Sequence, residues 1–166
     1  MREGRYFIFF IIAVVLQILA NNYLHLPSFI TICILPTLIT LIPSRVSTPY
    51  VLIIAFITAF ATDFLASGVL GLTIAALLPV ALLRNAFLTV TLGKEAFSRQ
   101  EDLSVEKHGL WRVSVILILS FLVYFSIFIW IDAAGTQSFL FNSLRLLCSL
   151  VSSYLISLLI IKVVAP

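Results

Sequence analysis

Charged residues are scarce in this sequence: Asp, Glu, Lys and Arg make up 10% of its 166 residues, whereas 62% are hydrophobic. A soluble fold of this length cannot bury so much apolar surface. Apolar runs of about 20 residues, enough to cross roughly 30 Å of hydrocarbon as a helix, recur along the chain. We therefore expect an all-α integral membrane protein with no room for a separate soluble domain.

Histidine and cysteine are also rare, with two of each. Cys33 and Cys148 fall inside apolar runs, where a disulfide or a two-thiol metal site is not expected. His25 and His108 have no Cys or carboxylate nearby at metal-ligand spacing. No serine is paired with a base and no glycine-rich phosphate loop is present. The sequence therefore predicts no enzyme, no cofactor and no metal site.

Six transmembrane spans are predicted in one domain that covers residues 1–166. The second span is short, and Pro36 in its middle removes a backbone donor, which predicts a kink. A re-entrant hairpin is the alternative for that segment. The predicted spans are residues 6–20, 29–42, 49–66, 69–92, 111–131 and 139–164.

Lys and Arg are absent from the connections 21–28, 67–68 and 132–138. Because basic residues stay on the cytoplasmic side, both termini are predicted to be cytoplasmic. A hairpin in place of the second span would put Arg45 outside, so the rule favours a full crossing there. The basic residues on the cytoplasmic side are Arg2, Arg5, Arg45, Lys94, Arg99, Lys107, Arg112 and Lys162.

This topology accounts for the net charge of +3, so nucleic-acid binding is not indicated. The one long connection, residues 93–110, is polar, of mixed charge and on the cytoplasmic side. We interpret it as a solvated loop, with a contact to a partner protein as the alternative.

Three ionisable residues lie inside the predicted spans, where such groups are costly and indicate function or specific packing. Asp63 and Arg145 are expected at similar depth near the outer surface, which predicts that they form an ion pair. Arg84 is expected roughly 20 Å deeper, and two orientations stay open for its long side chain: toward protein, or toward the cytoplasmic headgroups.

Polar and small residues recur at helical spacing around these charges. In the last span they form one stripe, which predicts a face toward protein or water. In the third span alanines accompany Asp63, and Gly71 opens the fourth span, a pattern typical of close helix approach. Two interpretations stay open: a pair that holds the bundle together, or a polar cavity or partner site open to the outside. The stripe consists of Ser138, Asn142, Arg145, Ser149 and Ser152.

These features resemble the MreD family of rod-shape-determining proteins. Gln17 is followed by Ile18-Leu19-Ala20-Asn21-Asn22, the second span closes in Leu41-Ile42-Pro43, and Asp63 is followed by Leu70-Gly71 at matching spacing. Length, six spans and a long connection between the fourth and fifth spans agree as well. The chain departs from the family pattern in having Ala59-Phe60-Ala61-Thr62 where members often have a glycine before the aspartate.

The resemblance implies a non-enzymatic component of the bacterial inner membrane that helps organise lateral peptidoglycan synthesis. Its implied partners are membrane lipid, MreC, MreB, the glycan polymerase RodA and the transpeptidase partner of RodA. The alternative is a substrate-binding S-component of a vitamin importer of the energy-coupling-factor type, a six-span bundle that the MreD family is thought to resemble. Asp63, Asn142 and Arg145 would then line an outward-facing ligand pocket.

Overall fold

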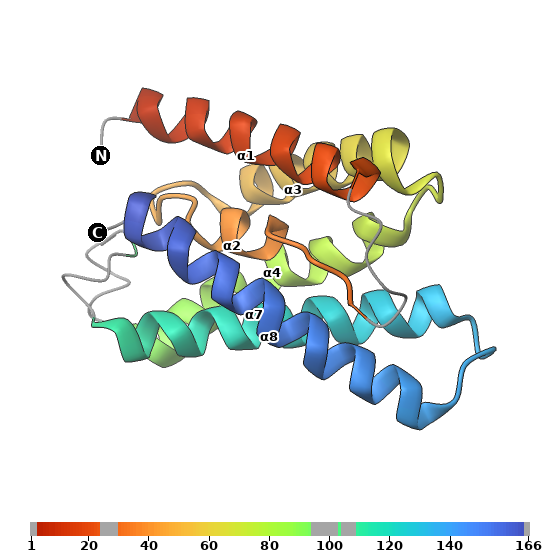
Figure 1. Cartoon of the computed structure of the whole chain (residues 1–166). Helices are drawn as coiled ribbons and strands as arrows, with labels where there is room; N and C mark the ends of the chain where they lie inside the picture. The colour runs from red at the N-terminus through yellow and green to blue at the C-terminus, as the bar shows by residue number, and fades with distance from the viewer. Residues whose placement is uncertain (1–2, 24–29, 94–102, 104–108, 165–166) are drawn as a thin grey trace.

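The computed structural model describes residues 3–23, 30–93, 103 and 109–164, which form six α-helices and one π-helical turn. The architecture is all-α, as predicted (Figure 1). The elements are α1 (Glu3–Tyr23), α2 (Leu35–Thr40), α3 (Thr48–Thr62), the π-helical turn η1 (Asp63–Ser67), α4 (Leu72–Leu92), α7 (Leu110–Ala133) and α8 (Phe139–Val164).

Four helical stretches within the described ranges are long and apolar enough to cross a bilayer. They correspond to the third to sixth predicted spans and differ from them by a few residues at their ends. The apolar part of α1, Phe7–Tyr23, is shorter. The four stretches are Thr48–Ala66, Leu72–Leu92, Leu110–Ala133 and Phe139–Ile161.

The second predicted span is not the kinked helix expected from the sequence. Residues 30–34 are non-helical, and α2 begins only at Leu35, with Pro36 in its first turn. Proline has no backbone N–H and its ring clashes with the carbonyl four residues earlier, so a first turn accepts it readily, whereas inside a helix it costs stability. Pro36 therefore starts a helix here, and the prediction of a mid-helix kink was wrong.

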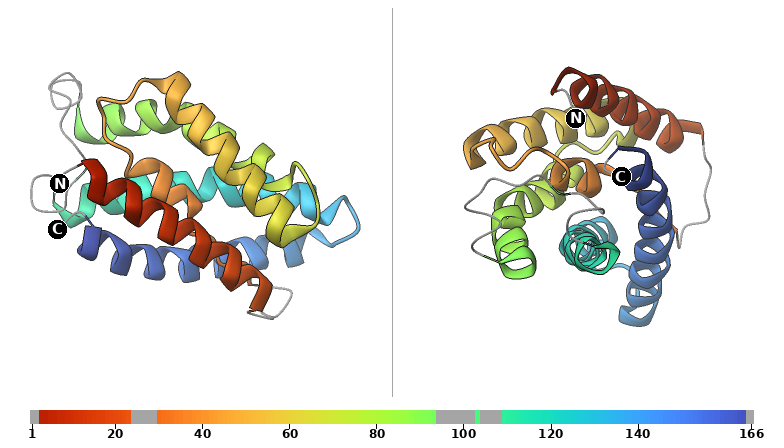
Figure 2. Two further views of the ribbon diagram at one scale, coloured as in Figure 1. Left: turned by 90° about the horizontal axis from the view of Figure 1, so that it is seen from above. Right: turned by 90° about the vertical axis from the view of Figure 1, so that its left-hand side faces the viewer.

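The helices run between two ends of the bundle. At one, which we call the terminal end, α1 begins and α8 finishes; at the other, the turn end, η1 leads into α4 and α7 leads into α8 (Figure 1). Viewed along the bundle, α2 lies near the centre, with the longer helices around it (Figure 2). All six residues of α2 are buried, so this short helix is enclosed by the others.

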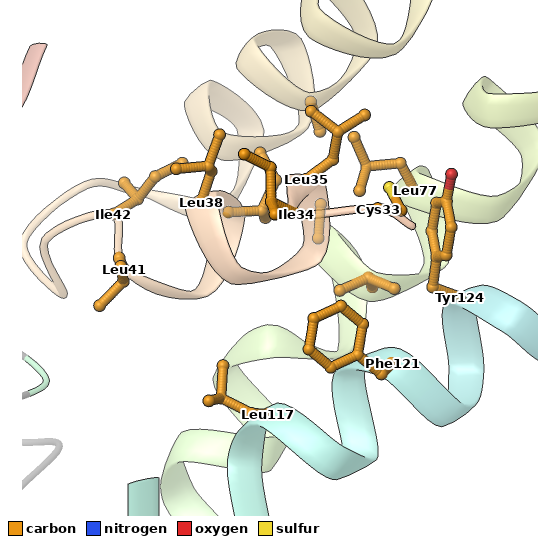
Figure 3. Packing of buried hydrophobic residues seen from close by; sticks show 14 of the residues in the cluster. Cys33, Ile34, Leu35, Leu38, Leu41, Ile42, Leu77, Leu117, Phe121 and Tyr124 are labelled. Carbon is orange, nitrogen blue, oxygen red and sulfur yellow. The ribbon is translucent and has the colours of Figure 1, made fainter. Parts of the chain in front are cut away.

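The apolar core forms where α2 meets α4 and α7 (Figure 3). Leu38 and Ile39 are fully buried in it, as is Phe121, whose ring stacks on that of Phe125 with centroids 5.9 Å apart. The opposite faces of the long helices expose large apolar side chains, including Phe56 and Leu147. Such a bundle, apolar both inside and outside, is suited to a lipid environment.

Most of the predicted cytoplasmic loop, residues 93–110, lies outside the described residues, and so do both histidines and many of the basic residues used for the topology. Leu103 is the exception within the loop: it is 7% exposed and belongs to the buried apolar cluster. The loop is therefore not solvated along its whole length.

Two neighbours on α7 test how much the core contributes to stability. We expect Phe121→Ala to lower the free energy of unfolding by about 3 kcal/mol, because it leaves a cavity beside α2. Leu122 is 46% exposed, so Leu122→Ala is expected to cost less than about 0.5 kcal/mol. Titration of the purified protein with SDS in mixed micelles measures both values, and equal losses would contradict the described packing.

Candidate functional site

The non-helical segment 30–34 has its backbone bound by side chains from two helices. On α1, the Gln17 amide donates from Nε2 to the Ile32 carbonyl at 3.0 Å and accepts the Ile34 N–H at Oε1 at 2.9 Å. Gln17 is 2% exposed. Unpaired backbone groups cost several kcal/mol in hydrocarbon, so irregular backbone at membrane depth needs partners of this kind.

The bond to Ile32 follows from Pro36. In a continuous helix the Ile32 carbonyl would accept the N–H of residue 36, four positions later. Proline has no N–H, so that carbonyl has no helical partner. The Gln17 side chain provides the missing donor from α1. A residue of the first helix thus compensates for the proline of the second.

Serines of α8 bind the other side of the same segment. The Thr31 N–H donates to Ser149 Oγ at 2.9 Å, and the Cys33 N–H donates to Ser153 Oγ at 3.0 Å. Residues 31 and 33 thus face α8 while residues 32 and 34 face α1, an alternation expected of extended backbone. One turn further along α8, Ser157 accepts a bond from the hydroxyl of Thr37 in α2, at 2.7 Å.

Asp63 caps the start of α4. Its carboxylate oxygens accept the backbone N–H groups of Gly71 at 2.9 Å, Thr73 at 3.0 Å and Ile74 at 3.4 Å, and the residue is fully buried. These donors have no partner within their own helix, and a negative charge is favourable at a helix N-terminus. Gly71 occupies the N-cap position with a φ of 99°, so it supplies the left-handed turn while Asp63 supplies the capping oxygens.

The predicted ion pair between Asp63 and Arg145 is wrong. Arg145 Nη1 instead donates to Asp132 Oδ2 at 2.7 Å, and its Nη2 donates to the hydroxyl of Thr31 at 3.2 Å. The prediction assigned Asp132 to a connecting loop, but α7 continues to Ala133 and brings this acid beside the first turns of α8. The ion pair therefore closes a helical hairpin.

Of the two orientations left open for Arg84, the structure has the one toward protein. The Arg84 side chain is 1% exposed, and Nη2 donates to the carbonyl of Ile42, just beyond α2. The adjacent Asn85 donates to Thr48 Oγ1 at 2.9 Å, at the start of α3. The two side chains hold α4 against the end of α2 and the start of α3 at the terminal end.

The predicted polar stripe of α8 is correct only in part. Asn142 and Ser149 are buried, but Ser152 bonds to the Cys148 carbonyl of its own helix. The buried row continues through Ser153 and Ser157, one position away from the predicted course. Asn142 Oδ1 and Arg145 Nε are buried without a hydrogen-bond partner in the part of the chain that the structure describes.

Both cysteines are free; Cys33 is buried and Cys148 is half-buried. The thiol of Cys33 lies beside the ring of Tyr124 (Figure 3). Tyr124 of α7 and Thr73 at the start of α4 are buried as well.

Comparisons with protein-family models, curated proteins and solved structures find no match for the chain. Membership of the MreD family, suggested by Gln17, Asp63 and Gly71, therefore stays a prediction. The geometry assigns these three residues to one kind of task, since each satisfies or shapes the backbone of a neighbouring segment.

Removing the Gln17 amide tests the role of this side chain. We expect Gln17→Leu to destabilise the protein by about 2 to 4 kcal/mol, because it leaves the buried Ile32 carbonyl and Ile34 N–H without partners. SDS titration measures the free energy of unfolding, and Leu16→Ala, at an exposed position, is the control. If Gln17→Leu left this free energy unchanged, the segment would not depend on α1.

Asp63→Asn retains one acceptor oxygen and turns an NH₂ group toward backbone donors. We expect a loss of about 2 kcal/mol in unfolding free energy, since a charged cap is replaced by a poorer neutral one. Asp132→Asn is the matched control, because its carboxylate is 36% exposed and its ion pair is expected to contribute less than about 1 kcal/mol. A larger loss for Asp132→Asn than for Asp63→Asn would contradict this assignment.

Proposed function

We propose that the protein is a non-enzymatic, multi-pass component of a bacterial inner membrane that helps organise lateral peptidoglycan synthesis, as members of the MreD family do. The proposal starts from the resemblance carried by Gln17, the Leu41-Ile42-Pro43 ending, Asp63 and Gly71. The implied partners are MreC and, with it, MreB, RodA and the transpeptidase partner of RodA.

The observation that carries this proposal is the use of the buried polar side chains. Gln17, Ser149 and Ser153 bind the backbone of segment 31–34, and Asp63 binds the first turn of α4. These groups are engaged within the bundle and stabilise its shape. A protein of this kind acts through its surface and its fold, which is what an organising component of a complex requires.

The proposed topology has six crossings, with both termini in the cytoplasm. Segment 30–34 and α2 together form the second crossing: Thr31 contacts Arg145 near the turn end, while Ile42 contacts Arg84 toward the terminal end. Exposed Arg45 precedes α3 and exposed Arg112 lies in the first turn of α7, both toward the terminal end. Basic residues there favour a cytoplasmic terminal end.

A substrate-binding S-component of a vitamin importer is the second candidate. Asn142 Oδ1 and Arg145 Nε favour it, because both are buried and lack partners in the described structure. Those two groups, rather than Asp63, would then contact a small polar ligand. Asp63 has no part in this alternative, since its oxygens are occupied by α4.

Affinity purification from native membranes in mild detergent distinguishes the two functions. Recovery of MreC and wall-synthesis proteins, identified by mass spectrometry, is the expected result. Recovery of an ATPase pair with a transmembrane coupling protein would overturn the proposal in favour of the importer.

The same purification tests whether Asp63 acts through the fold or by direct contact. We expect Asp63→Asn to lower the amount of folded protein and the amount of recovered partner in proportion, because the carboxylate faces α4 and no partner can reach it. Folded protein is quantified by fluorescence-detected size-exclusion chromatography, with Asp132→Asn as the control. Loss of partner at an unchanged level of folded protein would instead make Asp63 a contact residue.

A further inference from the structure

The buried face of α8 differs in composition from that of every other long helix. Over an apolar stretch of 18 residues, 22% of α8 is buried, against 44% of the neighbouring α7. Among the described apolar side chains of α8, Ile161 is the one that is fully buried, and half-buried residues such as Leu146 and Leu150 pack against the core. The other buried residues are polar: Asn142, Ser149, Ser153 and Ser157.

This polar face meets a polar counterpart. Ser149, Ser153 and Ser157 bond to the Thr31 N–H, the Cys33 N–H and the Thr37 hydroxyl, at 2.9, 3.0 and 2.7 Å. We call this interface, from Thr31 to Thr37 on one side and from Ser149 to Ser157 on the other, the polar seam. It is held by hydrogen bonds, whereas α2, α4 and α7 are held together by apolar packing.

Two buried polar groups extend the polar seam toward the turn end, and neither has a hydrogen-bond partner among the described residues. Asn142 is 2% exposed, and its Oδ1 has no partner among the described residues; Arg145 Nε, one turn along the same face, has none either. One is an acceptor and the other a donor. A water molecule satisfies both kinds of group, and leaving them dry is unfavourable.

We propose that the polar seam opens to water while α8 stays packed against α7. On opening, the serines of α8 can bond to carbonyls one turn earlier in their own helix, as Ser152 already does. The Thr31 and Cys33 N–H groups have no such option, because their segment is not helical. They need water, so the open state is hydrated along the irregular segment. This inference does not depend on which partner the protein binds.

A thiol placed in the polar seam reports its opening. Ser153→Cys in a Cys33→Ala/Cys148→Ala background gives one thiol opposite the irregular segment. Ser120→Cys in the same background is the matched control: Ser120 is equally buried, but it lies on α7 and bonds within its own helix. Reaction with N-ethylmaleimide in proteoliposomes is followed by intact mass. We expect the Ser153→Cys thiol to react at least tenfold faster than the control thiol; equal or slower reaction would overturn the proposal.

A crosslink provides an independent test. The Thr37 and Ser157 hydroxyl oxygens are 2.7 Å apart, so Thr37→Cys/Ser157→Cys brings two sulfurs close enough to oxidise to a disulfide. In the Cys33→Ala/Cys148→Ala background, the oxidised pair holds the polar seam shut. Deuterium uptake by the amides of residues 30–34 is expected to slow at least tenfold on oxidation and to recover on reduction. Uptake that is the same in both forms would overturn the proposal.

Discussion

The requirement that every backbone group find a partner in hydrocarbon governs this bundle. The long helices meet most of it with their own helical hydrogen bonds, but residues 30–34 cannot, because they are not helical and Pro36 lacks an N–H. Gln17 from the first helix and two serines from the last helix meet it instead. The positions of α1 and α8 around the central α2 follow from this arrangement, since each must present a polar side chain to the same short stretch of backbone.

Two buried charged side chains, one toward each end of the bundle, also bind backbone groups. Asp63 lies against donors at the start of α4, and Arg84 lies against a carbonyl beyond the end of α2. Each charge therefore meets backbone groups of opposite polarity, the pairing that helix ends favour. An ion pair between two helices would have constrained only their separation, whereas a capped helix end also fixes where the helix begins or finishes.

The helices were largely predictable from the sequence, and their polar contacts were not. Long apolar runs define α3, α4, α7 and α8 regardless of their neighbours, so hydropathy locates them within a few residues. Estimates of depth placed Asp63 and Arg145 near one another, but depth along a helix does not say which groups a side chain faces. The carboxylate of Asp63 instead binds backbone N–H groups eight to eleven residues later in the chain, at the start of α4. The short spacing between Asp63 and Gly71 is the feature of the sequence that could have indicated this contact. The role of Gln17 needed the tertiary structure, because its partners Ile32 and Ile34 are backbone groups that carry no sequence signal.

The α8 serines that bind the irregular segment are 118 and 120 residues away from the residues whose N–H groups they accept. At the usual pace of synthesis, about 5 to 20 residues per second, the ribosome adds the last helix roughly ten seconds after the irregular segment has been made. During that interval the Thr31 and Cys33 N–H groups have no α8 serine to bind and need another acceptor. The last helix is thus the element that completes the hydrogen bonding of the irregular segment, and a chain that ends before it would leave these two N–H groups without their serine acceptors.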